Sequence, residues 1–251
     1  MPLNISGNII NSEIVKRYPN TKISKAGLIL NLDASSTESY PGSGTVWYDL
    51  SGNANNFNIV AGAYNSSGVK YMDFNGSYGM AKNSTDISLS DSIGVTYVMW
   101  TRIKNSSADW RTLTRSYVND HHVIILAGGW EIGMYDNDSA GWISTGYSQQ
   151  SLPNYGTSNW ICMYWRWQSS SPYYEMSYND TPGTIRGSIT NTNARYNRGF
   201  GAIGGYHAAS TDPSVGSQFW GDIANFMCYN RRLTDTELLE TYNIQKGRFG
   251  L

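Results

Sequence analysis

The sequence predicts an all-β protein, a two-sheet antiparallel sandwich with one short C-terminal helix. Short apolar and aromatic runs recur along the chain, separated by clusters of Gly, Asn, Asp and Ser that form turns. Hydrophobic residues make up 40% of the 251 residues and aromatic residues 14%, which is enough to fill a wide core between two sheets. One strong helix-start signal lies near the C-terminus.

The strands are predicted from runs of β-branched and aromatic residues. Residues 27–33 form the first, with a strongly apolar centre. Residues 71–74 alternate in polarity, and Asn75-Gly76 predicts a hairpin turn into a strand that resumes at residues 77–80. Further strands are expected at residues 94–102, 110–115, 121–126, 130–134, 161–168, 173–178 and 219–229. Their spacing favours a sandwich over alternating strands and helices.

Residues 161–168 show the clearest two-residue period. Odd-numbered residues, including Trp165 and Trp167, share one face, and even-numbered residues share the other. The helix is predicted at about residues 235–243, because Thr234 and Glu237 form a capping-box pattern ahead of a short apolar stripe. It should end before Gly247 and cover one end of the sandwich.

Composition excludes several classes of function. A net charge of −1 argues against nucleic-acid binding, and no apolar run reaches the roughly 18 residues that membrane insertion needs. The N-terminal residues do not resemble a signal peptide. Cys162 and Cys228 are too few for a disulfide framework or a zinc site, so both are expected to be buried thiols, with a disulfide as the alternative.

Two segments carry a family resemblance. GLILNLDAS at 27–35 is followed by SYPGSGTVWYDLSGNANN at 39–56, and FWGDIANFMCYNRRLTDTE at 219–237 is followed by KGRFGL at 246–251. Together they resemble the laminin-G-like, concanavalin A-like jelly-roll domains found in tailed-bacteriophage virion structural proteins. The resemblance covers about residues 26–251 and implies that the last long strand lies beside the first. Residues 1–25 are polar and are expected to form a separate N-terminal arm.

The resemblance implies a virion structural protein, a capsid decoration or fibre-type component attached through the arm. Its partners would be a major capsid or tail protein and further copies of itself, and it would be located in the virion after assembly in the host cytoplasm. The alternative is a carbohydrate-binding, lectin-like module that recognises a host-surface glycan. The low charge content and the polar, Tyr-rich composition suit both.

Residues 128–158 are the predicted glycan-binding region, because they combine aromatic rings with many Gly, Ser and Asn residues. The candidate residues are Trp130, Tyr135, Trp142, Tyr147 and Tyr155. Alternatively, these rings pack the edge of the sandwich or a subunit contact.

No cofactor is expected except for a calcium ion, which some laminin-G-like relatives bind at the rim of the sandwich. Asp136 and Asp138 are the candidate ligands, since they supply carboxylate oxygens within one turn. Asp49 is a second candidate, but a turn in which its carboxylate accepts hydrogen bonds from backbone N–H groups is favoured there.

Enzymatic activity is not expected. Glycoside hydrolysis needs two facing carboxylates, but Glu131 is isolated, and Glu237 and Glu240 belong to the predicted helix. His121 and His122 are neighbours on one strand, so their side chains should point to opposite faces.

Overall fold

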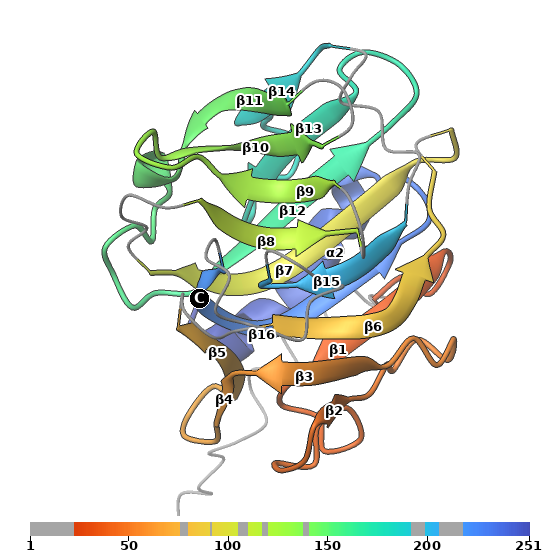
Figure 1. The fold of residues 1–251 in the computed structure, drawn as a ribbon, viewed down its shortest axis with the longest axis vertical. Coiled ribbons are helices and arrows are strands. Elements are labelled where there is room, and N and C mark those ends of the chain that lie inside the picture. Colours follow the sequence, from red (N-terminus) through yellow and green to blue (C-terminus); the bar gives the residue numbers. More distant parts are fainter. Residues whose placement is uncertain are drawn as a thin grey trace, which may run out of the picture.

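The computed structural model of the protein describes residues 23–75, 80–90, 92–104, 110–116, 120–137, 141–191, 199–205 and 218–251. Two antiparallel sheets pack face to face in these ranges, and one α-helix lies behind them (Figure 1). The predicted all-β jelly-roll sandwich with a C-terminal helix is therefore confirmed.

Sheet A contains both the first and the last strand of the described chain. Its members are β1 (Leu28–Asp33), β4 (Ala63–Asn65), β5 (Tyr71–Asn75), β7 (Val95–Ile103), β12 (Ile161–Trp167), β13 (Tyr174–Tyr178), β14 (Gly187–Ile189) and β16 (Trp220–Tyr229). They follow the order β14-β13-β12-β7-β16-β5-β4, and β1 also pairs with β16. The first strand and the last therefore lie side by side, as the family resemblance implies.

Sheet B is the second layer. Its strands are β2 (Val46–Trp47), β3 (Phe57–Ala61), β6 (Met80–Ile87), β8 (Arg111–Arg115), β9 (His121–Ile125), β10 (Glu131–Asp136), β11 (Gly141–Ser148) and β15 (Phe200–Ile203). Their order is β11-β10-β9-β8-β15-β6-β3-β2. Strands β8 to β11 thus form a meander in which neighbours in sequence are also neighbours in space. A short 3₁₀-helix, η1 (Gln149–Ser151), follows β11.

The prediction of a hairpin at Asn75-Gly76 is wrong, although residues 76–79, which include most of the strand expected at 77–80, lie outside the described residues. Strand β5 pairs with β4 and β16 in sheet A, whereas β6 pairs with β3 and β15 in sheet B. The chain therefore crosses between the sheets after β5. An Asn-Gly pair favours a tight turn locally, but it does not determine which strand the next segment pairs with.

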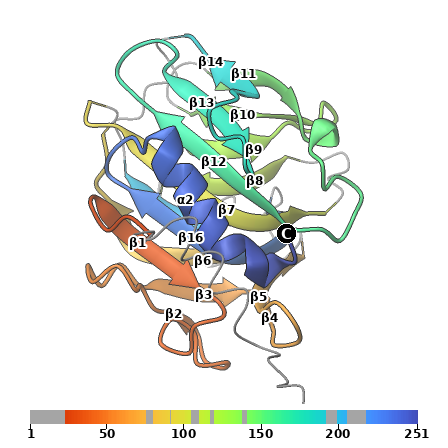
Figure 2. The same cartoon turned by 180° about the vertical axis from the view of Figure 1, so that it is seen from behind.

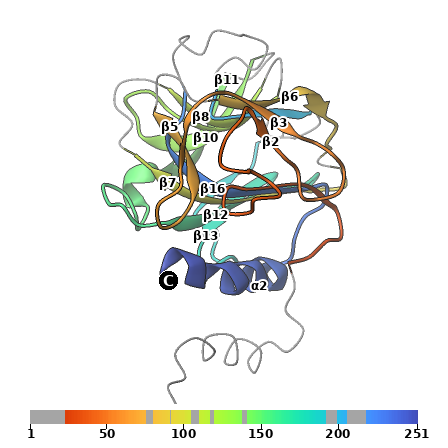
Figure 3. The ribbon, with the colours of Figure 1, turned by 90° about the horizontal axis from the view of Figure 1, so that it is seen from below.

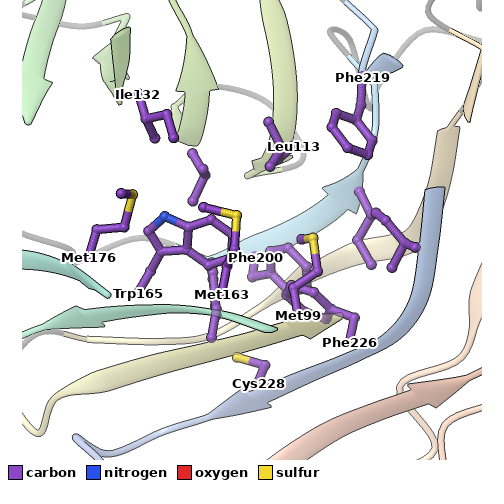
Figure 4. Close-up of a cluster of buried hydrophobic side chains, with 14 of the residues drawn as sticks. Met99, Leu113, Ile132, Met163, Trp165, Met176, Phe200, Phe219, Phe226 and Cys228 are labelled. Atoms are coloured by element: carbon purple, nitrogen blue, oxygen red, sulfur yellow. The ribbon is translucent and has the colours of Figure 1, made fainter. Parts of the chain in front are cut away.

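Side chains from both sheets fill the space between them. Met163 and Trp165 of β12 meet Ile132 of β10 and Leu113 of β8 in one buried cluster (Figure 4). Trp167, also on the odd-numbered face of β12, donates its indole N–H to Met134 Sδ at 3.5 Å. The predicted two-residue period of this strand is confirmed.

The C-terminal helix α2 (Asp235–Gln245) covers a face of sheet A and not an end of the sandwich (Figures 2 and 3). The reason is that β7, β12 and β16 also carry apolar side chains on the face turned away from sheet B. Cys162 and Tyr164 lie there, beneath Leu238 and Tyr242 of the helix. Without a cover these side chains would be left in water. The prediction that the helix covers an end is therefore corrected.

A 3₁₀-helix, η3 (Lys246–Phe249), continues α2 and completes this second core. The Phe249 ring stacks on Trp100 of β7 with their centroids 3.9 Å apart, and the Trp100 indole N–H donates to Gln245 Oε1 at 2.6 Å. Cys162 and Cys228 are both buried free thiols, as expected. The alternative of a disulfide is not realised.

The start of α2 is held by the predicted capping box. Thr234 Oγ1 accepts the backbone N–H of Glu237, and Glu237 Oε2 accepts the backbone N–H of Thr234. The buried Arg166 reaches the same turn, and its Nη1 lies 2.6 Å from Asp235 Oδ1. The helix is therefore fixed to sheet A at its first turn as well as along its apolar side.

Replacing Leu238 by Ala should lower the free energy of unfolding by about 2–5 kcal/mol, because it leaves a cavity between α2 and sheet A. Leu239→Ala removes the same atoms from a half-buried position and should cost about 1 kcal/mol or less. Urea unfolding of both variants checks this. Equal losses would contradict the burial of Leu238 between α2 and sheet A.

Glu237 predicts a pH dependence of stability. A hydrogen bond from the Arg231 guanidinium lowers the pKa of Glu237 to about 2, opposed by burial and supported by Thr234. Because the pKa is depressed in the folded state, the stabilisation is present above about pH 4.5 and is lost as the pH falls towards 2. The difference in unfolding free energy between wild type and Glu237→Gln should therefore shrink over that interval. Glu240→Gln on the same helix is the control for loss of one charge.

Candidate functional site

A pocket of about 120 Å³ opens on sheet B and is lined by Trp110, His121, Ile124, Tyr135 and Asn137. It lies on the face turned away from sheet A. His121 defines this face, because its neighbour His122 points the other way, to the Tyr97 hydroxyl of sheet A. The pocket is therefore formed by the outer side chains of the β8–β10 meander.

Aromatic rings form most of the pocket. Trp110 meets Tyr135 edge-to-face, with ring centroids 5.5 Å apart, and meets Trp142 at 5.3 Å. The His121 ring contacts Tyr135 at 6.1 Å. Tyr135 is the cross-strand partner of both His121 and Trp142, so one face of three adjacent strands carries three rings in a row.

Gly133 makes room for this arrangement. A Cβ atom at this position would lie 2.2 Å from the Ile143 carbonyl oxygen and 2.6 Å from the Trp142 ring. Trp142 therefore lies directly over the bare backbone of β10. Any larger residue at position 133 would push the indole away from Trp110.

The two adjacent histidines have different environments. His121 Nδ1 lies 2.8 Å from Thr112 Oγ1, a hydrogen bond that orients the ring at the pocket wall. His122 is fully enclosed in the core. Burial lowers its pKa well below the usual value, and the nearby His121 and Arg115 add to that effect. His122 is therefore neutral at physiological pH, and the predicted opposite orientation of the two side chains is confirmed.

The structure brings together two of the five predicted glycan-binding residues. Tyr135 lines the pocket and Trp142 supports it. Trp130 and Tyr155 instead contact each other, with centroids 6.3 Å apart. Tyr147 packs against the core and shares a 3.1 Å hydrogen bond with Tyr178. For these last three, the alternative of packing at the sandwich edge fits their contacts.

The remaining lining residues were not expected from the sequence. His121 and Ile124 lie on β9 and Trp110 directly precedes β8, all outside the predicted region of residues 128–158, whereas Asn137 lies inside that region but was not among the five candidates. The order of β8, β9, β10 and β11 along the chain could have indicated that these strands lie side by side, because consecutive strands of a meander are neighbours. Their register, however, is shifted by irregularities in the β8–β9 and β9–β10 pairs, and the sequence did not show these.

The predicted calcium site is only partly described. Asp136 ends β10, and Asp138 lies outside the described residues. Within the described ranges, no group of three or more His, Cys, Asp or Glu side chains could hold a metal ion. Calcium binding at this turn stays a prediction.

The second calcium candidate, Asp49, is engaged as the favoured turn interpretation predicts. Its Oδ1 accepts the backbone N–H groups of Asn31 and Ser51 at 2.9 and 2.8 Å. Its Oδ2 accepts the Ser51 hydroxyl and the Asn55 N–H at 2.6 and 3.0 Å. Four donors saturate the carboxylate, so it organises the loop.

The same loop closes the free edge of β1. Asn53 and Asn55 donate their side-chain amides to the carbonyl oxygens of Leu28 and Ile29, at 3.2 and 2.7 Å. Leu50 N–H adds a hydrogen bond to the Asn31 carbonyl at 2.9 Å. Loop groups thus occupy the outer edge of β1 where a further strand would otherwise pair.

Two of the three carboxylates considered for glycoside hydrolysis have other partners. Glu131 Oε2 accepts the Ser144 hydroxyl at 2.5 Å, and Glu237 belongs to the capping box with Arg231. A larger hollow of about 430 Å³ lies beside the first turn of α2 and contains Arg166, Glu175, Arg232 and Asp235. These four groups pair with one another, which assigns them to holding the helix.

Among the helices in the described ranges, none is long and apolar enough to cross a membrane.

Asp49→Ala should lower the free energy of unfolding by about 3 kcal/mol, since it leaves three half-buried backbone donors without their acceptor. Asp49→Asn keeps one acceptor oxygen and should cost less. Thermal or urea unfolding of the two variants measures the difference. A wild-type stability for Asp49→Ala would show that the loop does not depend on this carboxylate.

No family model and no curated protein matches the sequence. Solved structures do match in fold. The binding domain of Paraclostridial Mosquitocidal Protein 1 aligns with a TM-score of 0.61 and 15% identity, over 88% of this chain and 52% of that one. The receptor binding domain of botulinum neurotoxin C/D mosaic serotype aligns with a TM-score of 0.60 and 12% identity, over the same shares.

Trypanosoma rangeli sialidase in complex with sialic acid also aligns, with a TM-score of 0.55 and 16% identity, over 90% of this chain and 34% of the sialidase chain. The protein thus spans about half the length of the toxin domains and a third of the sialidase. At these identities, the likeness establishes a shared β-sandwich fold.

Proposed function

We propose that this protein is a glycan-binding, lectin-like module that holds a sugar in the pocket lined by Trp110, His121, Ile124, Tyr135 and Asn137. The observation that carries the proposal is the cluster of aromatic rings around this pocket. Aromatic faces stack on the C–H groups of a pyranose ring, while nearby polar groups bond its hydroxyls.

The pocket combines both kinds of group. Tyr135 and Asn137 offer a hydroxyl and an amide beside the rings. The rings already support one another through Trp142, and Gly133 lets that support approach closely. A site whose side chains are already ordered loses little conformational entropy when a ligand binds.

The structural neighbours support binding over catalysis. Two of them are binding domains of toxins, and one is named as receptor-binding. The sialidase is an enzyme, but this chain spans only about a third of it. Glu131 and Glu237, two of the three carboxylates considered for hydrolysis, are held by Ser144 and Arg231. We therefore expect a non-enzymatic protein.

Attachment to a phage particle stays a prediction. Residues 1–22 of the expected arm, 1–25, lie outside the described residues, and the structures named above are toxin domains and a sialidase. Location in the virion, capsid or tail partners and homo-oligomerisation are predictions of the same standing. A glycan-binding module displayed on a virion would combine the virion structural role with the glycan-binding function.

Trp110→Ala and Tyr135→Ala should each weaken glycan binding at least about tenfold, or about 1.4 kcal/mol, because each removes a ring from the pocket. The wild type is first screened on a glycan array. Affinities for the best ligand are then measured by calorimetry, with circular dichroism to confirm that each variant is folded.

Trp130→Ala is the matched control. Like Trp110, Trp130 is a half-buried tryptophan that directly precedes a strand, here β10. It contacts Tyr155 and does not line the pocket. Its variant should keep wild-type affinity. Loss of binding in Trp130→Ala alone would move the site to the Trp130–Tyr155 pair, and an array without any bound glycan would refute the proposed function.

A further inference from the structure

We propose that the pocket on sheet B selects a single uncharged sugar residue and discriminates against sugars that carry a carboxylate. This inference rests on the proposed function and deepens it by naming the class of sugar. It is drawn from the size of the pocket, the chemistry of its wall and the charge beside it.

The size limits what can enter. Sites for drug-sized ligands occupy about 300–1,000 Å³, whereas this pocket measures about 120 Å³. It can take one sugar ring or part of one, with any further residues of a glycan lying outside. Recognition inside the pocket therefore depends on a single residue.

Among the residues that the structure describes, the wall carries no fixed positive charge. The five described lining residues are two large aromatics, an isoleucine, an asparagine and a histidine, with no Arg or Lys among them. Arg115 lies opposite His121 in the strand register, but it is buried, donates to the Ser116 carbonyl and does not line the pocket. A carboxylate that entered would lose its water without gaining a cationic partner from the wall, which is unfavourable.

One negative charge lies next to the pocket. Asp120 precedes His121 in the chain, and its Oδ1 accepts the backbone N–H of Asn137 at 3.2 Å. Its carboxylate therefore touches the backbone of a lining residue. At this solvent-exposed rim it disfavours an anionic ligand, and it leaves neutral hydroxyl groups unaffected.

Hexosides and hexuronides offer a matched test, because they differ only in a carboxylate at C6. Affinities are measured by calorimetry or ligand-observed NMR for methyl glycosides of glucose, galactose and mannose and for the corresponding uronic acids. For whichever hexoside binds, its hexuronide should bind at least about tenfold more weakly. The methyl ester of that hexuronide, which removes the charge, should restore affinity to within about threefold.

Asp120→Asn isolates the contribution of the neighbouring carboxylate. It keeps an oxygen that can accept the Asn137 N–H, and it should strengthen hexuronide binding severalfold without changing hexoside binding. A hexuronide that binds as tightly as its hexoside, or an ester that stays weak, would overturn the inference and leave the proposed function in place. Absence of binding to every sugar tested and to every array glycan would overturn the proposed function itself.

Discussion

Burial of sheet A on both faces is the constraint on which the rest of the structure depends. Strands β7, β12 and β16 carry large apolar side chains in both directions, so the sheet needs two covers. Sheet B covers one face and α2 covers the other. Polar groups under the helix must also find partners there, and the hydrogen bonds from Trp100 to Gln245, and from Gln245 to Asn225 of β16, provide them. These contacts set where the helix lies.

Much of this fold could be predicted from the sequence, because the central strands are long and strongly patterned. The period of residues 161–168 separates the two cores correctly, since Trp165 and Tyr164 lie on opposite sides of sheet A. The helix start was also predictable, because a capping box is a local signal. Strands β2, β3, β4, β6, β11, β14 and β15 were not predicted. Several of them are short or polar and become strands through pairing with neighbours, which no local pattern records.

The pocket was harder to predict than the fold, because it is assembled from separate strands. The aromatic content of residues 128–158 pointed to Tyr135 and Trp142, which do lie at the pocket. Trp110 and His121 reach the same place only through the register of β8, β9 and β10, and that register is shifted by local irregularities. The helix position was misjudged for a related reason, because the apolar even-numbered face of β12 was not recognised as a surface that needs a cover.

The loop around Asp49 has a consequence for how copies of this protein can associate. A bare edge strand invites a second chain to extend the sheet, which leads to domain-swapped or fibrous assemblies. At β1 that route would require Asn53 and Asn55 to release the carbonyl oxygens of Leu28 and Ile29, together with the turn that Asp49 organises. A second copy that approached this edge would meet loop side chains and not free backbone groups. The loop therefore protects the protein against polymerisation at β1.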